Sequence, residues 1–182
     1  MSGRGPLQIV TLCTGNAARS VMAGIMLAQL AEFEGISVNI TTAGTHVVEG
    51  QPMGQRTKAA LESVGELDTS TLGLHRSHQL SVQDCERADV IIAMEADHIR
   101  FIRRVHANSA QKTVTLTRLV REISVEEAPF VDRLQALDLQ NVSLEEEQDV
   151  VDPAGGEQPQ YDACAQEIWE LCQITTALLV TE

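Results

Sequence analysis

Strand and helix patterns alternate from the start of the chain. Gln8–Leu12 is a short, apolar and partly β-branched segment, which is typical of a buried strand. Between Ser20 and Gly35 the apolar residues recur near helical spacing, with Ser20 as a candidate N-cap and Gly35 where a helix would stop. Parallel strands need such a crossover helix between them. The first residues therefore already favour a parallel sheet.

The same alternation continues to the end of the chain. Further strands are predicted at Ser37–Thr42, Ala88–Met94 and Val114–Leu116, and further helices at Arg56–Val64, Asp97–Val105, Thr117–Ile123 and Tyr161–Val180. Strands separated by helices imply right-handed crossovers and an α/β fold whose parallel sheet has helices on both faces. In such sheets the ligand lies beyond the carboxyl ends of the strands. The first predicted strand ends at Cys13.

Length and charge narrow the class of protein. The 182 residues fit one domain spanning residues 1–182, and the net charge of −13 argues against sequence-independent binding to nucleic acid. We expect no membrane span and no secretory leader, because no apolar run is long enough. The four cysteines (Cys13, Cys85, Cys164 and Cys172) lack zinc-site spacing and form no disulfide framework. A cytoplasmic monomer without a metal or cofactor is the expectation.

Acidic residues are concentrated between Glu122 and Asp162, where Arg133 is the single basic residue. We interpret residues 125–150 as an acidic insertion that is weakly structured and lies on the solvated surface. Pro129 and the three consecutive glutamates at 145–147 favour loops and exposed helix ends over core.

The segment Cys13–Arg19, with the sequence Cys-Thr-Gly-Asn-Ala-Ala-Arg, joins the first strand to the first helix. A loop in this place aims its backbone N–H groups and the positive helix end at one point, which favours an anion such as phosphate. Gly15 and Asn16 are residue types that tolerate left-handed backbone angles. The predicted phosphate-binding residues are Thr14, Gly15, Asn16, Ala17, Ala18 and Arg19.

Reactive side chains flank this loop. The field of the loop favours the thiolate form of Cys13, which is the nucleophilic form. Arg19 offers a planar fork for two phosphate oxygens. A thiolate that attacks a phosphate ester needs an acid to protonate the departing oxygen, and Asp152 supplies a carboxylate in a turn-rich segment before the last helix.

Several of these segments resemble a known family. Cys13–Ala23 resembles the signature of the low-molecular-weight protein tyrosine phosphatases. Thr42–Thr45, His75–Ser81, Ala88–Met94 and Val151–Pro153 resemble, in the same order, that family's second-strand end, histidine-containing loop, third strand and acid loop. The resemblance implies a Rossmann-like domain with a four-stranded parallel sheet. It also implies hydrolysis of phosphotyrosine or related phosphomonoesters through a cysteinyl-phosphate intermediate.

The resemblance also implies roles for single residues. Cys13 would be the nucleophile, Arg19 the group that binds phosphate and stabilises the transition state, and Asp152 first the general acid and then the base that activates water. Ser20 would donate a hydrogen bond to the Cys13 thiolate. The shape of the loop would be held by Asn16 with support from His75. No metal is needed in this scheme, and the substrate would be a phosphorylated protein or a small phosphomonoester.

Four positions depart from the family pattern. Ala18 stands where a second cysteine often protects the nucleophile, and Gly24 where the helix usually carries an acidic residue. Ala154 replaces an aromatic wall of the substrate slot. Ala17 is neither the larger apolar residue of the tyrosine phosphatases nor the threonine of the arginine phosphatase branch. These changes predict a wider and less selective slot, with Tyr161 as the nearest aromatic residue in the sequence.

Two other functions fit parts of the pattern. A thiol-coupled arsenate reductase shares the fold and resembles Asn16–Ser20 and Asp152–Gly155, but it needs a resolving thiol. The third predicted strand ends in Met94 and Cys85 precedes it, so only coupling to an external thiol carrier remains open. A non-catalytic phosphate-binding module that keeps the loop without turnover is the other alternative.

Overall fold

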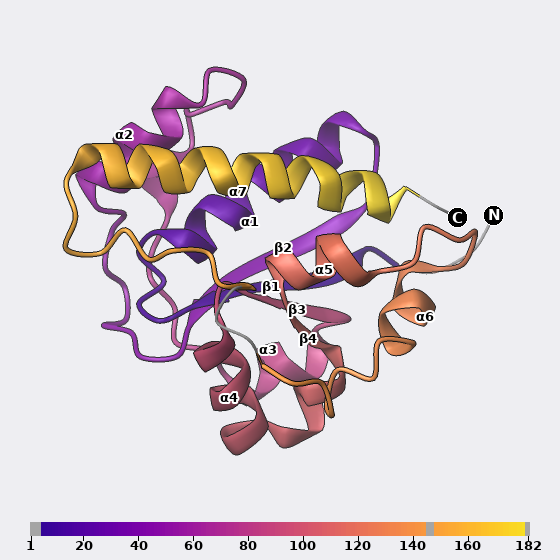
Figure 1. Ribbon diagram of the computed structural model, residues 1–182. Helices are drawn as coiled ribbons and strands as arrows, with labels where there is room; N and C mark the ends of the chain where they lie inside the picture. Colours follow the sequence, from indigo (N-terminus) through magenta and orange to yellow (C-terminus); the bar gives the residue numbers. More distant parts are fainter. Residues whose placement is uncertain (1–4, 145–147, 181–182) are drawn as a thin grey trace.

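The computed structural model describes residues 5–144 and 148–180. Its four strands form one parallel sheet in the order β2-β1-β3-β4 (Figure 1). The strands are β1 (Leu7–Cys13), β2 (Val38–Gly44), β3 (Val90–Ala93) and β4 (Thr113–Thr115). The register pairs Cys13 with Gly44 and Leu12 with Ala93, so the carboxyl ends of the three strands meet at one edge. The predicted α/β fold with a four-stranded parallel sheet is confirmed.

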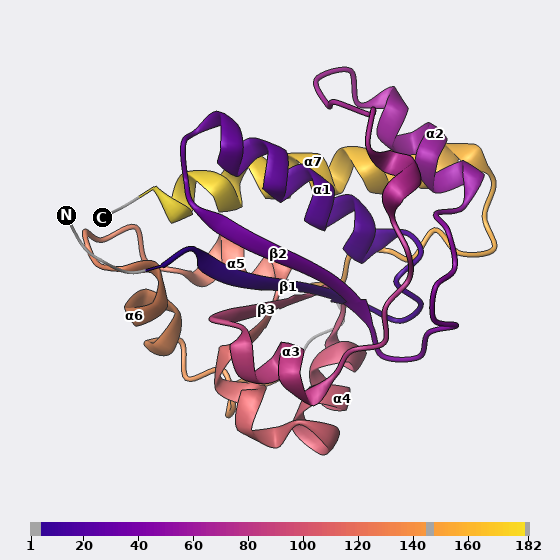
Figure 2. The same ribbon diagram turned by 180° about the vertical axis from the view of Figure 1, so that it is seen from behind.

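Helices cover both faces of the sheet (Figures 1 and 2). On one face lie α1 (Arg19–Phe33), α2 (Gln55–Ser63), α5 (Leu116–Glu122) and α7 (Gln158–Leu179), and on the other lie α3 (Val82–Arg87) and α4 (Ala96–Val105). The remaining helical segments are α6 (Phe130–Gln135) and the 3₁₀ turns Leu72–Leu74 and Ala107–Lys112. Among the described helices, none is both long enough and apolar enough to cross a membrane.

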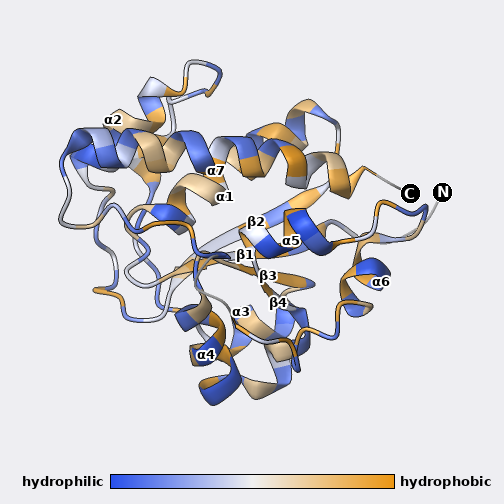
Figure 3. Ribbon diagram, in the orientation of Figure 1, coloured by the Kyte–Doolittle hydropathy of each residue, from blue (hydrophilic) through white to orange (hydrophobic). Residues whose placement is uncertain are grey.

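The core follows the alternation of side chains along the strands. Ile9 of β1 belongs to the larger hydrophobic cluster, together with residues of α1 and α7. Val10 and Leu12 belong to a separate cluster with residues of α3 and α4. Figure 3 shows β3 as hydrophobic along its length, whereas α7 alternates between hydrophobic and hydrophilic residues. Strands buried on both faces are what a parallel sheet requires.

Two predicted helix starts are wrong. α1 begins at Arg19 rather than after Ser20, whose side chain is buried and contacts Cys13. α5 begins at Leu116, and the hydroxyl that accepts a hydrogen bond from its first turn belongs to Thr115, not Thr117. In both places the segment between the strand and the helix is shorter than the sequence pattern suggests.

The expectation of a weakly structured acidic stretch is wrong for its described part. The stretch contains α6, whose Phe130 and Leu134 are buried in the larger hydrophobic cluster. Three arginine side chains, Arg103, Arg118 and Arg133, donate hydrogen bonds to backbone carbonyl groups in or beside the stretch. Charged donors make strong hydrogen bonds, so these contacts fix the path of the backbone. The glutamates at 145–147 lie outside the described residues.

Candidate active site

A cleft of about 690 Å³ lies at the carboxyl end of β1. It is lined by Cys13 and the loop after it, by the start of α2, and by Asp152, Ala154 and Tyr161. This is the edge where the sheet topology predicts a ligand. The structure thus brings together the predicted nucleophile, the predicted phosphate loop and the predicted acid, although Asp152 is far from the loop in the sequence.

The loop between β1 and α1 owes its shape to one buried asparagine. Asn16 has a positive φ of 49°, whereas Gly15 does not adopt the left-handed conformation. The side-chain nitrogen of Asn16 donates to Ser20 Oγ at 2.9 Å. Ser20 Oγ in turn lies 2.9 Å from Cys13 Sγ. Because Ser20 Oγ already accepts a hydrogen from Asn16, its own proton is available for the sulfur of Cys13.

The segment 75–78 holds Asn16 from the other side. The backbone carbonyl of Asn16 accepts hydrogen bonds from Ser77 Oγ at 3.0 Å and contacts His75 Nε2 at 3.1 Å. Its side-chain oxygen accepts from the backbone N–H of His78 at 2.9 Å. Burial lowers the pKa of His75, which favours a neutral ring whose Nε2–H donates to that carbonyl. The predicted supporting position of His75 beside Asn16 is therefore present in the structure.

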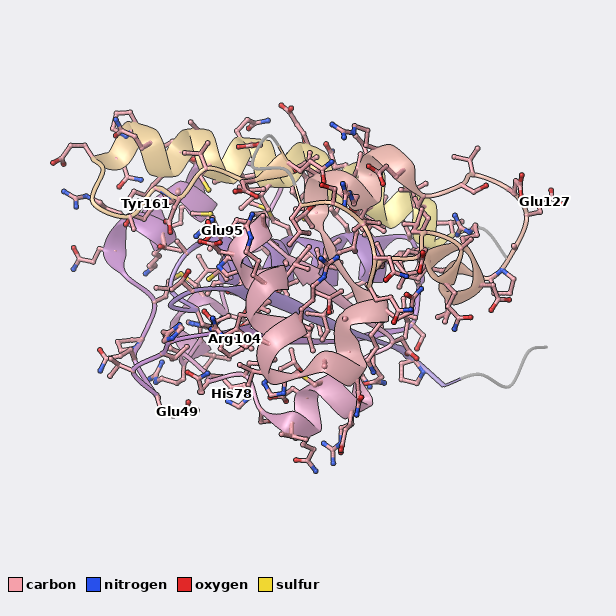
Figure 4. All side chains as sticks on the ribbon, turned by 60° about the horizontal axis from the view of Figure 1, so that its bottom comes forward. Glu49, His78, Glu95, Arg104, Glu127 and Tyr161 are labelled. Atoms are coloured by element: carbon pink, nitrogen blue, oxygen red, sulfur yellow. The ribbon has the colours of Figure 1, made fainter. Side chains whose placement is uncertain are left out.

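His78 is tied to two carboxylates in addition to the loop. Its ring lies 3.1 Å from Glu49 Oε1 and 2.8 Å from Asp84 Oδ2, measured from Nδ1 and Nε2 (Figure 4). Burial alone would lower the pKa of His78, but the contacts with Asp84 and Glu49 raise it above its usual value. Asp84 also forms a capping box with Ser81 at the start of α3. The backbone that holds Asn16 is thus anchored to α3.

Arg19 is buried and is surrounded by acceptors. Its guanidinium donates to Glu95 Oε2 at 2.5 Å, to the backbone carbonyl of Val150 at 3.0 Å and to Asp152 Oδ2 at 2.6 Å. Burial alone would lower the pKa of Arg19, but the contacts with Glu95 and Asp152 raise it. The side chain is only 2% exposed, so these partners fix its direction toward the cleft.

Two glycines allow close approaches between elements, one of them beside the loop. A Cβ atom at Gly44 would lie 2.5 Å from the Thr14 carbonyl oxygen and 2.9 Å from the Asn16 nitrogen. A Cβ atom at Gly24 would lie 2.4 Å from Thr42 Cγ2, because α1 packs directly on β2 there. The departure from the family pattern at Gly24 therefore has a packing reason, since any larger side chain would have to displace Thr42.

Sequence reasoning missed two residues of the site. Glu95 lies two residues after the end of β3 and accepts a hydrogen bond from Arg19. His98 in the first turn of α4 lies 3.0 Å from Thr14 Oγ1, measured from Nε2. Burial, followed by the charge of Arg19, lowers the pKa of His98 to about 3, so its ring is neutral at ordinary pH. The signal for Glu95 was its place after Met94, since polar residues at the carboxyl ends of parallel strands face the ligand.

The four cysteine thiols are free. Burial raises the pKa of Cys164 to about 12 and, in the cluster on the opposite face, burial raises that of Cys85 to about 11. Such thiols are poor partners for disulfide exchange, which proceeds through the thiolate. Among residues 5–144 and 148–180, no group of three potential ligands is placed to hold a metal ion.

Peroxide is therefore expected to inactivate the protein by oxidising Cys13 without forming a protective disulfide. Ala18 supplies no thiol beside Cys13, and the other three thiols are buried. The measurement is peptide mass spectrometry after treatment with hydrogen peroxide, which should find sulfinic or sulfonic acid at Cys13. Detection of Cys13 linked to Cys164 or to another cysteine of this chain would contradict the expectation.

Comparison with known families gives a match over most of the chain. The family model described as low molecular weight phosphotyrosine protein phosphatase matches residues 8–132. A protein-arginine-phosphatase of Bacillus subtilis is 33% identical over 114 residues, which cover 63% of this chain and 73% of that protein. Low molecular weight protein-tyrosine phosphatase A of Mycobacterium tuberculosis is 32% identical over 111 residues, which cover 58% of this chain and 63% of that protein.

Solved structures agree with this match. The arginine phosphatase YwlE of Geobacillus stearothermophilus superimposes with a TM-score of 0.70 at 26% identity, covering 94% of this chain and 92% of that chain. A YwlE variant in which serine replaces cysteine, and whose active-site serine is phosphorylated, gives a TM-score of 0.75 at 26% identity. That comparison covers 95% of each chain.

Proposed function

The chain belongs to the low molecular weight phosphotyrosine protein phosphatase family, and from this premise we propose that Cys13 is the nucleophile of a phosphatase acting on phosphorylated proteins. The observation that carries the proposal is one cleft that holds Cys13 with its Ser20 partner, the buried Arg19 and Asp152. The phosphorylated serine in the YwlE variant supports a covalent intermediate on the residue in this place.

In the first step the Cys13 thiolate attacks phosphorus and the bond to the leaving oxygen breaks. Asp152 gives its proton to that oxygen, so the leaving group departs as an alcohol or phenol. Arg19 and the loop N–H groups stabilise the charge on the three remaining phosphoryl oxygens. In the second step Asp152 takes a proton from water, which attacks phosphorus and releases inorganic phosphate. Ser20 stabilises the thiolate as it leaves.

In the structure, hydrogen bonds hold Asp152 in a position where it does not protonate a leaving group. One of its carboxylate oxygens accepts from Arg19 and the other from the backbone N–H of Ala154 at 2.9 Å. A phosphate group in the loop competes for the same guanidinium, because both are anions. Binding of the substrate would therefore release Asp152 toward the leaving oxygen while Glu95 and the Val150 carbonyl keep Arg19 in place. Asp152 is 43% exposed, which leaves it room to move.

The residues that line the cleft indicate which substrates it accepts. Ala17 and Ala154 leave a wide slot, and Tyr161 is the aromatic residue that lines it. Phosphotyrosine and phosphoarginine are both proposed as substrates, since relatives with either activity in their names match the chain at similar identity. In phosphoarginine the bond that breaks is P–N, and Asp152 would give its proton to the departing guanidino nitrogen. We propose a cytoplasmic monomer that binds neither nucleic acid nor membranes, supported by the free cysteines and the net charge of −13.

Replacing Ala154 with tyrosine is expected to lower KM for a phosphotyrosine peptide by up to roughly tenfold, if about 1 kcal/mol of ring packing is gained. Ala154 lies on the exposed rim of the cleft, so the new ring has space to form a wall. Steady-state kinetics of both forms on one peptide measure the effect, with Ala154→Leu as the control for apolar bulk without a ring. An unchanged KM would mean that the slot is already closed by another segment.

The two alternatives are weaker on this geometry. The three other cysteines are buried, so the chain offers no resolving thiol of its own and an arsenate reductase would depend on an external thiol carrier. A non-catalytic module has no need of an acid beside the loop. Pre-steady-state kinetics with p-nitrophenyl phosphate separate the possibilities, because a cysteine phosphatase is expected to release nitrophenol in a burst before the phosphoenzyme is hydrolysed. Arsenate-dependent oxidation of an added thiol carrier, without such a burst, would favour the reductase.

A further inference from the structure

We propose that His98 is a positioning residue that turns the hydroxyl group of Thr14 into a hydrogen-bond donor toward the substrate. The inference rests on the proposed phosphatase function and assigns two side chains that the mechanism above leaves unused. Thr14 is exposed at the wall of the cleft, whereas His98 is 1% exposed behind it.

The contacts of His98 settle which ring nitrogen carries the proton. The backbone N–H of Glu95 donates to His98 Nδ1 at 3.2 Å, so Nδ1 is an acceptor and carries no hydrogen. The ring is neutral, so its single hydrogen is on Nε2. Nε2 lies 3.0 Å from Thr14 Oγ1 and 3.4 Å from Glu95 Oε1. The Nε2–H group therefore donates toward the Thr14 hydroxyl, with the Glu95 carboxylate as its second acceptor.

This direction has a consequence for Thr14. A hydroxyl group has one proton to donate, and its oxygen can accept at the same time. Since Thr14 Oγ1 accepts from His98, its proton points away from the ring and is free for another acceptor. Thr14 lines the cleft beside Cys13, so an acceptor on the bound substrate is the partner that completes the arrangement.

Glu95 and His98 together link two parts of the site. Glu95 uses one carboxylate oxygen for Arg19 and lies 3.4 Å from His98 through the other. His98 therefore connects Glu95, which aligns Arg19, to Thr14, the residue after Cys13. The histidine is held at both nitrogens, so its Nε2–H group keeps one lone pair of Thr14 Oγ1 occupied.

Four variants test the inference through steady-state kinetics with p-nitrophenyl phosphate and a phosphotyrosine peptide. Thr14→Val removes the hydroxyl at nearly constant shape. His98→Asn keeps an acceptor near Nδ1 for the Glu95 N–H, but its amide N–H groups end short of the position of Nε2 and do not reach Thr14. His98→Gln places an amide donor near the position of Nε2. Arg104→Gln, on the exposed part of α4 (Figure 4), is the matched control outside the site.

One lost hydrogen bond to the substrate should raise KM about three- to tenfold in Thr14→Val and in His98→Asn, with kcat little changed. His98→Gln should lose less than His98→Asn. A double variant that combines Thr14→Val with His98→Asn should have the KM of Thr14→Val alone, because both changes remove the same contact. Weaker inhibition by inorganic phosphate would place the contact on the phosphate group, and an effect on KM alone would place it on the leaving group. Either result supports the inference.

Three results would overturn it: an unchanged KM in Thr14→Val, equal losses in His98→Asn and His98→Gln, or a further rise in KM when His98→Asn is added to Thr14→Val. Thermal unfolding of each variant shows whether loss of the buried ring weakens the fold, and the double variant separates that effect from the contact with Thr14. A wild-type protein without turnover would refute the proposed function instead. The inference would then be decided by calorimetric titration with inorganic phosphate and with phenyl phosphate, which an inactive protein leaves intact. Affinity for both ligands unchanged by Thr14→Val would overturn it.

Discussion

Replacing Cys13 with serine is expected to abolish turnover of phosphomonoesters while the fold and the binding of inorganic phosphate are largely retained. A serine hydroxyl is not ionised by the loop, so it is a far weaker nucleophile than a thiolate. The change adds no bulk beside Ser20, which lies 2.9 Å from the sulfur in the unmodified protein. Turnover of p-nitrophenyl phosphate and calorimetric titration with phosphate measure the two properties separately.

The control for this change is another buried cysteine. Cys85→Ser makes the same exchange in the hydrophobic cluster on the opposite side of the sheet, where it should leave turnover intact. Activity of Cys13→Ser above about 1% of the unmodified protein would remove Cys13 from its role as nucleophile. Loss of phosphate binding together with activity would point to collapse of the loop instead.

Asp152→Asn is expected to lower turnover of substrates with poor leaving groups by roughly 10²–10⁴, the usual worth of a positioned proton donor. An amide has no acidic proton to give. Its oxygen can still accept from Arg19 or from the Ala154 N–H, so the loop around position 152 should keep its shape. Phenols that leave readily as anions should suffer less in the first step, because they need less protonation.

A series of aryl phosphates with different leaving groups measures this effect. The logarithm of the rate of phosphoenzyme formation should depend more steeply on leaving-group pKa in Asp152→Asn than in the unmodified protein. Asp162→Asn, on α7 beyond the acid loop, is the matched control. An equal loss for every leaving group would assign Asp152 a structural role or a role in hydrolysis of the phosphoenzyme alone.

Local patterns explain why much of the fold and site could be predicted from sequence. β1, the loop and α1 are contiguous, so a buried strand followed by Cys13–Arg19 and a helix already places the nucleophile and the arginine on one anion site. The backbone angle that shapes the loop was assigned to a pair of residues, and the structure gives it to Asn16 alone. A sequence pattern shows which residue types tolerate the angle, whereas the contacts of Asn16 with Ser20 and His78 decide which residue adopts it.

Contacts between distant segments were the part that could not be predicted. Glu95 and His98 reach Arg19 and Thr14 across 76 and 84 residues of sequence. The acidic stretch was misjudged for the same reason. Its carboxylates suggested a solvated surface, but Arg103 and Arg118, which precede it in sequence, donate hydrogen bonds to its backbone carbonyl groups. Net charge reports the surface and carries no information about buried guanidinium groups that bind carbonyl oxygens.

The central claim is that Cys13 carries the phosphoryl group during turnover, and acid quenching tests it most directly. The unmodified protein is mixed with p-nitrophenyl phosphate, quenched within the first turnover and digested for peptide mass spectrometry. We predict a peptide that contains Cys13 with the added mass of one phosphoryl group, formed in step with the burst of nitrophenol. Absence of that adduct while nitrophenol is released, or a phosphoryl group on any other residue, would contradict the account.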